Sequence, residues 1–198
     1  DMRGASQANS GMYVQGLATI CLCEASAMER DDRDLRRIAL EAARFIEKCQ
    51  GRDGGWRYRP RDRHGDTSVV GWQIMALQSA KAGGISVSPS TFSDAKKFLN
   101  SVEADDGVYY GYMRPEVRRP TTTAVGLLCR MYLGWRRDKP ELKKGVAYLS
   151  GVGPGREDIY YNYYATQVLY HWGGELWESW NRQMREQLVA TQIKAGPG

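Results

Sequence analysis

Four segments of the chain are apolar on almost every side of a helix. They cover residues 12–22, 67–77, 121–131 and 163–172. Their starts lie roughly 40 to 55 residues apart, which is typical of two-helix repeats. A helix without a polar face is buried on several sides. The pattern therefore predicts four copies of a buried inner helix.

A more polar segment follows each of these four, at residues 35–49, 92–102, 142–149 and 176–188. In the first, Ile38 and Phe45 belong to an apolar stripe at helical spacing, while Arg37 and Glu41 lie on the other face. Such helices bury one stripe only. We therefore expect an all-α fold of four helical hairpins, with residues 1–198 as one domain. Periodicity alone leaves an α/α ring and an open solenoid as alternatives. Strand signals are weak, and residues 108–112 are the only candidate.

Residues that start and stop helices agree with this division. Side chains that accept backbone N–H bonds predict helix N-caps at Ser10, Asp34 and Asp66. Glycine tolerates the left-handed conformation that often follows a helix, and proline tolerates the first helical position. On these grounds, inner helices are expected to close at Gly83-Gly84 and Gly173-Gly174, and outer helices to open near Pro89 and Pro140.

Composition adds little to this picture. The chain has 198 residues and a formal net charge of +5, which favours an anionic partner or simply a solvated basic surface. Its four cysteines form no Cys-Xaa-Xaa-Cys pair, and we expect Cys21, Cys23, Cys49 and Cys129 to be buried small hydrophobes.

No apolar run reaches the roughly 20 residues that span a bilayer, and no signal peptide is recognisable, so the compartment stays open. The abrupt ends predict a fragment of a longer chain.

The segment between the first outer helix and the next inner helix carries a family resemblance. Gln50 is followed by a glycine-rich turn and then by Trp56. This resembles the QW motif of the squalene cyclase and protein prenyltransferase superfamily. The glutamine amide can bond a neighbouring helix end, and the tryptophan can cover those bonds. A degenerate copy has Glu103 near the glutamine position and Tyr109 near the aromatic position.

The resemblance covers essentially the whole chain, and it is greatest to squalene-cyclase-like repeat regions of large uncharacterised bacterial proteins. It implies an α/α toroid, a ring with inner and outer helix layers. Rings of this superfamily commonly hold about six hairpins, so four imply an incomplete ring.

The chemistry of the superfamily is hard to find in these residues. Triterpene cyclases protonate an alkene with an acid from an Asp-Xaa-Asp-Asp motif, and Asp31 to Asp34 have the wrong order and lie in a charged loop. Prenyltransferases hold zinc with Asp, Cys and His. The stretch that begins at Asp158 resembles the start of the zinc histidine helix, but Tyr161 takes the histidine place and Asn162 that of a threonine. We therefore expect no catalytic residue, metal or cofactor within the chain.

Two groups of residues remain as candidate sites. Aromatic faces line the cavities of the cyclases and stabilise cations there, although packing between helices explains the same residues here. The cavity-lining candidates are Tyr13, Asp66, Trp72, Tyr160, Tyr161 and Tyr164, and Tyr163 and Trp172 belong to the same group of aromatic residues on or beside the inner helices.

The second group is basic and would bind an anion, unless neighbouring acidic residues neutralise it. Its members lie in two loops, with Arg136 and Arg137 in a third, and in a ring these loops would converge on one rim. The anion-binding candidates are Arg57, Arg59, Arg61, Arg63, Arg114, Arg118 and Arg119.

These observations favour a non-catalytic binding or scaffold module of a larger bacterial protein. Its partner would be another region of the parent chain, a separate protein, or an apolar or anionic small ligand. No nucleic-acid-binding module matches, so we expect no nucleic-acid partner. The alternative is an isoprenoid cyclase or prenyltransferase whose acid or metal ligands lie outside these residues.

Overall fold

The computed structural model describes residues 11–192 and residue 196. This part of the chain is all-α, as predicted, apart from a two-stranded antiparallel pairing of Glu103 with Tyr110 and of Ala104 with Tyr109. The elements are α1 (Gly11–Met28), α2 (Arg33–Lys48), α3 (Thr67–Ala82), α4 (Pro89–Val102), β1 (Glu103–Ala104), the 3-10 turn η1 (Asp105–Gly107), β2 (Tyr109–Tyr110), α5 (Pro120–Tyr132), α6 (Pro140–Val152), α7 (Ile159–Trp172) and α8 (Gly174–Thr191).

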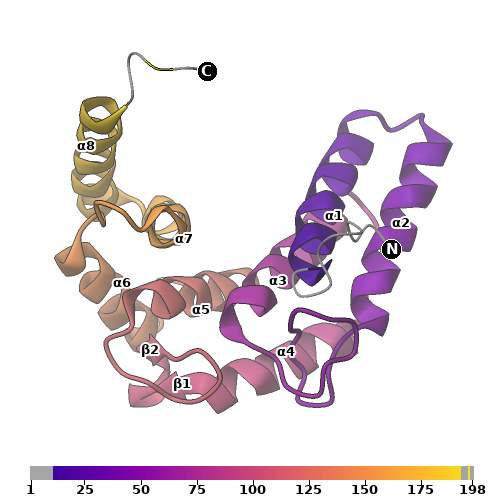
Figure 1. The fold of residues 1–198 in the computed structure, drawn as a ribbon, viewed down its shortest axis with the longest axis horizontal. Coiled ribbons are helices and arrows are strands. Elements are labelled where there is room, and N and C mark those ends of the chain that lie inside the picture. The colour runs from indigo at the N-terminus through magenta and orange to yellow at the C-terminus, as the bar shows by residue number, and fades with distance from the viewer. Residues whose placement is uncertain (1–10, 193–195, 197–198) are drawn as a thin grey trace.

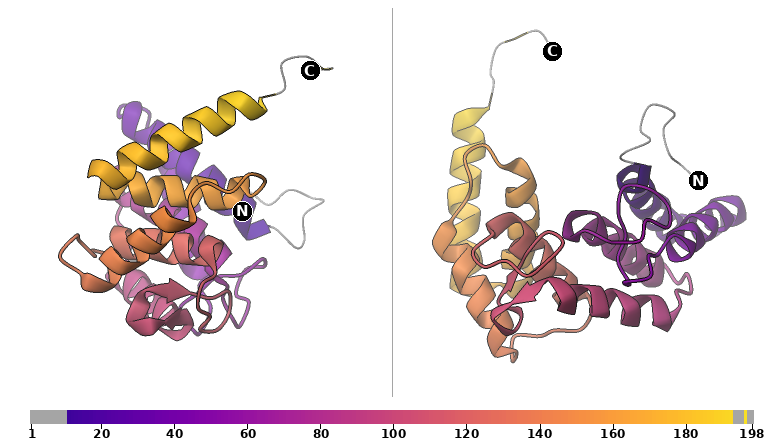
Figure 2. Two further views of the ribbon diagram at one scale, coloured as in Figure 1. Left: turned by 90° about the vertical axis from the view of Figure 1, so that its left-hand side faces the viewer. Right: turned by 60° about the horizontal axis from the view of Figure 1, so that its bottom comes forward.

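The eight helices form four consecutive pairs arranged in an open arc (Figure 1). The odd-numbered helices α1, α3, α5 and α7 pack each against the next and form the inner layer. The even-numbered helices α2, α4, α6 and α8 pack on the outside of their own partners (Figure 2). Helices α1 and α7 face each other across the open side of the arc (Figure 1).

Burial distinguishes the two layers in the way that the sequence pattern predicts. Helix α3 buries residues around its whole circumference, among them Val69, Val70 and Leu77. Helix α2 buries one stripe, which includes Ala39 and Ile46, and exposes the opposite face. The inner helices therefore provide most of the core, and the outer helices shield them from solvent.

A small residue allows the inner helices to approach one another closely. A Cβ atom on Gly71 of α3 would lie 2.6 Å from Val125 Cγ1 of α5 and 3.0 Å from the Tyr164 hydroxyl of α7. Real Cβ atoms do not approach other atoms so closely, so Gly71 sets the spacing of three inner helices.

The predicted helix ends are mostly confirmed. Asp66 is the N-cap of α3, and its carboxylate accepts the backbone N–H of Val69. For α2 the prediction was wrong by two residues: Asp32 is the cap, and it accepts the N–H of Leu35. The predicted Asp34 lies in the first turn, where its charge still favours the helix dipole. Ser10 lies outside the described residues.

Glycine and proline occupy the predicted positions. Helices α3 and α7 end immediately before Gly83 and Gly173, and Gly84 and Gly173 have φ values of +75° and +70°. Pro89 and Pro140 are the first residues of α4 and α6. The reasons are the expected ones: glycine tolerates a positive φ after a helix, and proline tolerates the first helical position.

Three of the four cysteines are buried, and Cys21 is exposed, which corrects the expectation for that residue. Cys21 lies two positions from Cys23 on α1, so the two side chains point in different directions. Burial raises the pKa of the Cys23 thiol to about 11 and that of Cys129 to about 12. These two side chains therefore stay as neutral thiols at physiological pH.

The turn between α2 and α3 ties the first hairpin to the second. The Gln50 amide donates to the carbonyl oxygens of Gly54, at 2.8 Å, and of Thr91 in the first turn of α4, at 3.0 Å. Trp56 is 1% exposed, and its indole N–H donates to the carbonyl oxygen of Ile46 at 2.8 Å. The expected amide bond to a neighbouring helix is present, and the tryptophan fixes the turn against the helix before it.

The turn between α4 and α5 is held by other side chains than the turn between α2 and α3. Tyr110 is the fully buried aromatic, whereas the predicted Tyr109 is only partly buried and packs edge-on against Tyr148. Glu103, at the glutamine position, forms an ion pair with Arg130 of α5 at 2.5 Å. An ion pair therefore joins this turn to the inner layer where the first turn has an amide bond.

Candidate functional site

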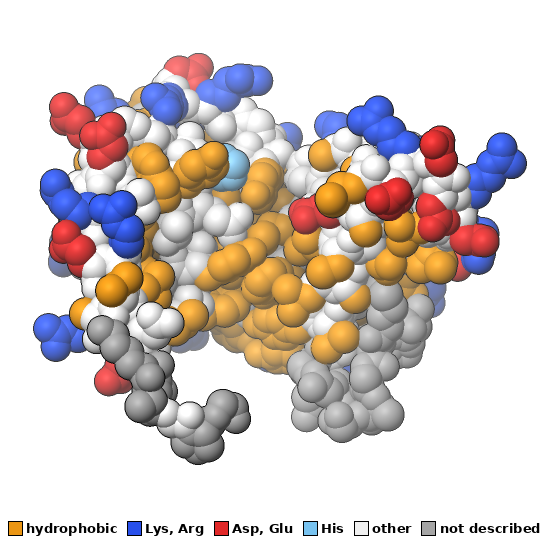
Figure 3. Space-filling view, turned by 90° about the horizontal axis from the view of Figure 1, so that it is seen from above, with side chains coloured by type: hydrophobic (Ala, Val, Ile, Leu, Met, Phe, Trp, Pro, Cys, Tyr) orange, Lys and Arg blue, Asp and Glu red, His pale blue; other side chains and the backbone are white. Residues whose placement is uncertain are grey.

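The concave side of the arc contains a hollow of about 470 Å³ that is lined by all four inner helices. Seen from the open side, hydrophobic side chains gather between the two arms of the arc, and charged side chains lie around the outer edges (Figure 3). The hollow lies in the C-terminal parts of α1, α3 and α5 and beside the middle of α7. Its lining residues are Ile20, Glu24, Met75, Gln78, Ser79, Ala82, Tyr132, Tyr163 and Gln167.

The N-terminal end of the inner layer is filled by aromatic side chains. The Tyr13 hydroxyl of α1 donates to Ser68 Oγ of α3 at 2.7 Å. The Tyr160 hydroxyl of α7 donates to the carbonyl oxygen of the same Ser68 at 3.2 Å. Ser68 thus connects α1 and α7, which face each other across the arc.

Trp72 and Tyr164 continue this aromatic packing toward the hollow. The Trp72 ring stacks on Tyr163 with centroids 5.3 Å apart and an angle of 20° between the planes. Tyr164 is fully buried and packs edge-on against both Trp72 and Tyr163. Burial raises the pKa of the Tyr164 hydroxyl, which keeps it neutral.

Tyr161 faces the outer layer. Its ring packs edge-on against Trp180 of α8, and its hydroxyl donates to the carbonyl oxygen of Gly153 at 3.1 Å. The lining of the hollow therefore includes none of the six aromatic and acidic residues that were predicted to line a cavity. Five of them lie toward the N-terminal ends of the inner helices, and Tyr161 lies between α7 and α8.

Asp66 is a buried carboxyl group at the N-terminal end of α3. Its Oδ1 accepts hydrogen bonds from Ser68 Oγ at 2.5 Å and from the Val69 N–H at 2.9 Å. Its Oδ2 has no hydrogen-bond partner and lies 3.9 Å from Arg57 Nε. Burial raises the pKa of this carboxyl above its usual value, against the opposing effects of its hydrogen bonds and of Arg57.

The raised pKa of Asp66 predicts a specific pH dependence of stability. Because the folded state binds this proton more tightly than the unfolded state, wild-type stability falls as pH rises from about 4, the ordinary aspartate pKa, through the raised folded pKa. Asp66→Asn keeps a side-chain acceptor for the Val69 N–H and does not titrate. In urea unfolding between pH 4 and 8, we expect the wild type to lose stability relative to this variant. A relative gain with rising pH would contradict a raised pKa.

The predicted anion-binding residues lie in two loops at the N-terminal end of the inner helices. The two loops meet at Tyr58 and Tyr112, whose hydroxyl oxygens are 2.5 Å apart. The loop before α3 holds Arg57, Arg59, Arg61 and Arg63, and the loop before α5 holds Arg114, Arg118 and Arg119.

Of the predicted anion-binding residues, only Arg57, Arg59 and Arg63 line a common pocket. Arg61 lies outside the pocket of its loop, because its Nε donates to the Lys48 carbonyl oxygen at 3.2 Å. Arg119 pairs with Glu116 at 3.6 Å, and Arg114 and Arg118 are exposed and line neither pocket of these loops. The pocket of the first loop, of about 380 Å³, is lined by Arg57, Tyr58, Arg59, Asp62, Arg63 and His64.

The expectation that three basic loops converge on one rim was wrong. Arg136 and Arg137 follow the C-terminus of α5, whereas the other two loops precede α3 and α5. Because α3 and α5 are successive inner helices of one layer, these positions lie at opposite ends of it. Arg137 instead covers the Trp172 ring at 5.6 Å from its centroid.

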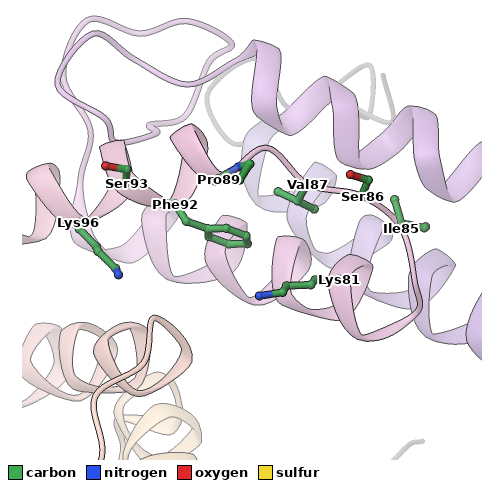
Figure 4. A pocket seen from close by; sticks show the side chains of 8 residues that line it. All are labelled: Lys81, Ile85, Ser86, Val87, Pro89, Phe92, Ser93 and Lys96. Atoms are coloured by element: carbon green, nitrogen blue, oxygen red, sulfur yellow. The ribbon is translucent and has the colours of Figure 1, made fainter.

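Apart from Tyr163, the sequence prediction missed the residues that line the hollow, and it also missed a second pocket. This pocket of about 400 Å³ lies between α3 and α4 (Figure 4). Lys81 Nζ lies 6.0 Å from the centroid of the Phe92 ring there, with Lys96 at the same pocket. A signal for the hollow was available: Glu24 is the only charged residue in the 18 residues of α1.

Among residues 11–192 and 196, no three His, Cys, Asp or Glu side chains are placed to hold a metal ion together. None of the helices in the same part of the chain is both long enough and apolar enough to cross a membrane. No protein-family model matches the chain, and no curated protein or solved structure matches it either.

Proposed function

We propose that this chain is a binding module of the α/α-toroid type, similar to the terpenoid cyclase and prenyltransferase repeats, and that the hollow on its concave side is the binding surface. The observation that carries the proposal is the hollow itself, to which all four inner helices contribute. A concave site of a few hundred Å³ with an apolar lining and a few polar groups is the usual form of a small-ligand site.

The lining favours binding over catalysis. Apart from the tyrosine hydroxyls, its only ionisable group is the carboxylate of Glu24, which is exposed. The desolvated carboxyl group, Asp66, lies outside the lining and serves as the N-cap of α3. A cyclase would need such an acid beside the substrate, and a prenyltransferase would need metal ligands there. The hollow itself offers neither arrangement.

Filling the hollow tests this proposal. Ala82 is an exposed residue of the lining, and Ala82→Trp would occupy much of the space without disturbing the core. With the neutral apolar fluorophore N-phenyl-1-naphthylamine as probe, we expect affinity to fall by about tenfold or more, or about 1.4 kcal/mol. Fluorescence titration of the wild type and the variant measures the difference.

Ala190→Trp is the matched control, because Ala190 is exposed on α8 and lies outside the hollow. We expect it to bind the fluorophore as the wild type does. Equal binding by all three proteins, or no binding by the wild type, would refute the hollow as the binding surface. Squalene and a prenyl diphosphate serve as competitors, and displacement of the fluorophore would identify an isoprenoid-like ligand.

A further inference from the structure

The hollow on the concave side carries a single formal charge. Glu24 of α1 contributes a carboxylate, and no Lys, Arg or His side chain is among the lining residues. Among the residues that the structure describes, Glu24 has no ion-pair partner. In a chain with a formal net charge of +5, the hollow is thus a locally negative site.

The Glu24 carboxylate is held in place from the neighbouring inner helix. Ser79 Oγ of α3 donates to Glu24 Oε1 at 3.1 Å. A carboxylate has two oxygens and about four acceptor positions, so this bond leaves most of its capacity for another donor or a cation. The held side chain loses less conformational entropy when a ligand binds than a free one would.

Aromatic rings border the same space. Tyr163 is 42% exposed, and Trp72 covers one face of its ring. Burial raises the pKa of the Tyr163 and Tyr132 hydroxyls, and in both cases the negative charge of Glu24 raises it further. Glu24, Tyr132 and Tyr163 all line the hollow, and the carboxylate is near enough for its charge to act on both hydroxyls.

We propose that the hollow binds an organic cation of the quaternary ammonium type. Glu24 neutralises its charge, the faces of Tyr163 and Tyr132 attract its methyl groups, and Ile20 and Met75 pack against its apolar body. A cation over an aromatic ring gains about 0.5–2 kcal/mol, depending on how far it is desolvated. One carboxylate is too few ligands for a divalent metal ion, which takes six or more oxygens in the case of calcium.

This inference rests on the proposed function, and it is tested with a pair of probes that differ in charge alone. Choline and its uncharged isostere 3,3-dimethylbutan-1-ol have the same shape and the same hydroxyl group. We expect calorimetry or ligand-observed NMR to show wild-type protein binding choline about tenfold or more tightly than the neutral alcohol. Glu24→Gln should reduce the preference for choline several-fold and leave the alcohol unaffected, and the attraction of the cation to the rings should keep a small preference.

Glu29→Gln is the matched control, because it removes the same charge from an exposed glutamate just after α1 that lies outside the lining. We expect it to keep the preference for choline. Equal affinity for both probes in the wild type, or an undiminished preference in Glu24→Gln, would overturn the inference. The fluorophore titration decides the proposed function separately: if Ala82→Trp abolishes fluorophore binding while choline is not preferred, the hollow binds ligands but not this cation.

Discussion

Replacing Trp56 with alanine is expected to lower the free energy of unfolding by about 3–5 kcal/mol, which is the usual cost of deleting a buried tryptophan. The side chain is 1% exposed and fills the turn between the first two hairpins. Its indole N–H donates to the carbonyl oxygen of Ile46, which the substitution would leave without this bond. Urea unfolding followed by circular dichroism measures the loss.

Two further variants separate packing from hydrogen bonding at this turn. Trp56→Phe keeps an aromatic ring and removes the donor, so we expect a smaller loss of about 1–3 kcal/mol. Trp177→Ala truncates a partly buried tryptophan on α8 and should cost less than Trp56→Ala. A loss below about 1 kcal/mol for Trp56→Ala would mean that the turn does not hold the hairpins together.

Replacing Arg130 with methionine is expected to destabilise the fold by about 2–4 kcal/mol, because it leaves a partly buried carboxylate without its partner. Arg130 is 4% exposed, and its guanidinium donates to Glu103, Asn100 and the Tyr110 hydroxyl. The guanidinium also lies 4.9 Å from the centroid of the Trp135 ring. Methionine fills the space of the arginine stem, so the loss reports on the charge and its hydrogen bonds.

A double-mutant cycle distinguishes this ion pair from simple packing. Glu103→Leu combined with Arg130→Met removes both charges, and we expect it to recover part of the stability lost in Arg130→Met alone. Urea unfolding of the wild type, the two single variants and the double variant gives the coupling energy. Strictly additive losses would show that the two side chains do not stabilise each other.

The helical framework could be predicted from local signals. Inner and outer helices differ in how much of their circumference is apolar, and the glycines and prolines at Gly83, Gly173, Pro89 and Pro140 define ends that the structure confirms. The errors are also local. Asp32 and Asp34 both suit the N-terminal end of a helix, and only the backbone geometry of Asp32 makes it the cap.

The candidate site could not be predicted in the same way, because it depends on how four helices meet. Trp72 and Tyr164 were candidates for a cavity lining, yet they pack on each other and on Tyr163. Tyr132 and Gln167 lie 35 residues apart in the sequence and share a hydrogen bond beside the hollow. The periodicity of a single helix does not indicate which residues of another helix it will contact.

Isolated charges in the inner helices were the one available signal. Helices α1, α3 and α5 each contain a single Lys, Arg, Asp or Glu residue, which is Glu24, Lys81 and Arg130 respectively. Glu24 lines the hollow, Lys81 lines the pocket between α3 and α4, and Arg130 forms the buried ion pair. Arg130 is buried and needs the partner that it has, whereas Glu24 and Lys81 are exposed and mark the edges of two pockets.

The most direct test of the hollow as the binding surface is a methyl NMR spectrum of the protein titrated with N-phenyl-1-naphthylamine. With Ile, Met, Ala, Leu and Val methyl groups labelled, we predict the largest shift changes at Ile20, Met75 and Ala82, which line the hollow. Shift changes confined to the exposed Leu188 and Val189 of α8 would contradict this, because they would place the binding surface on the outer layer.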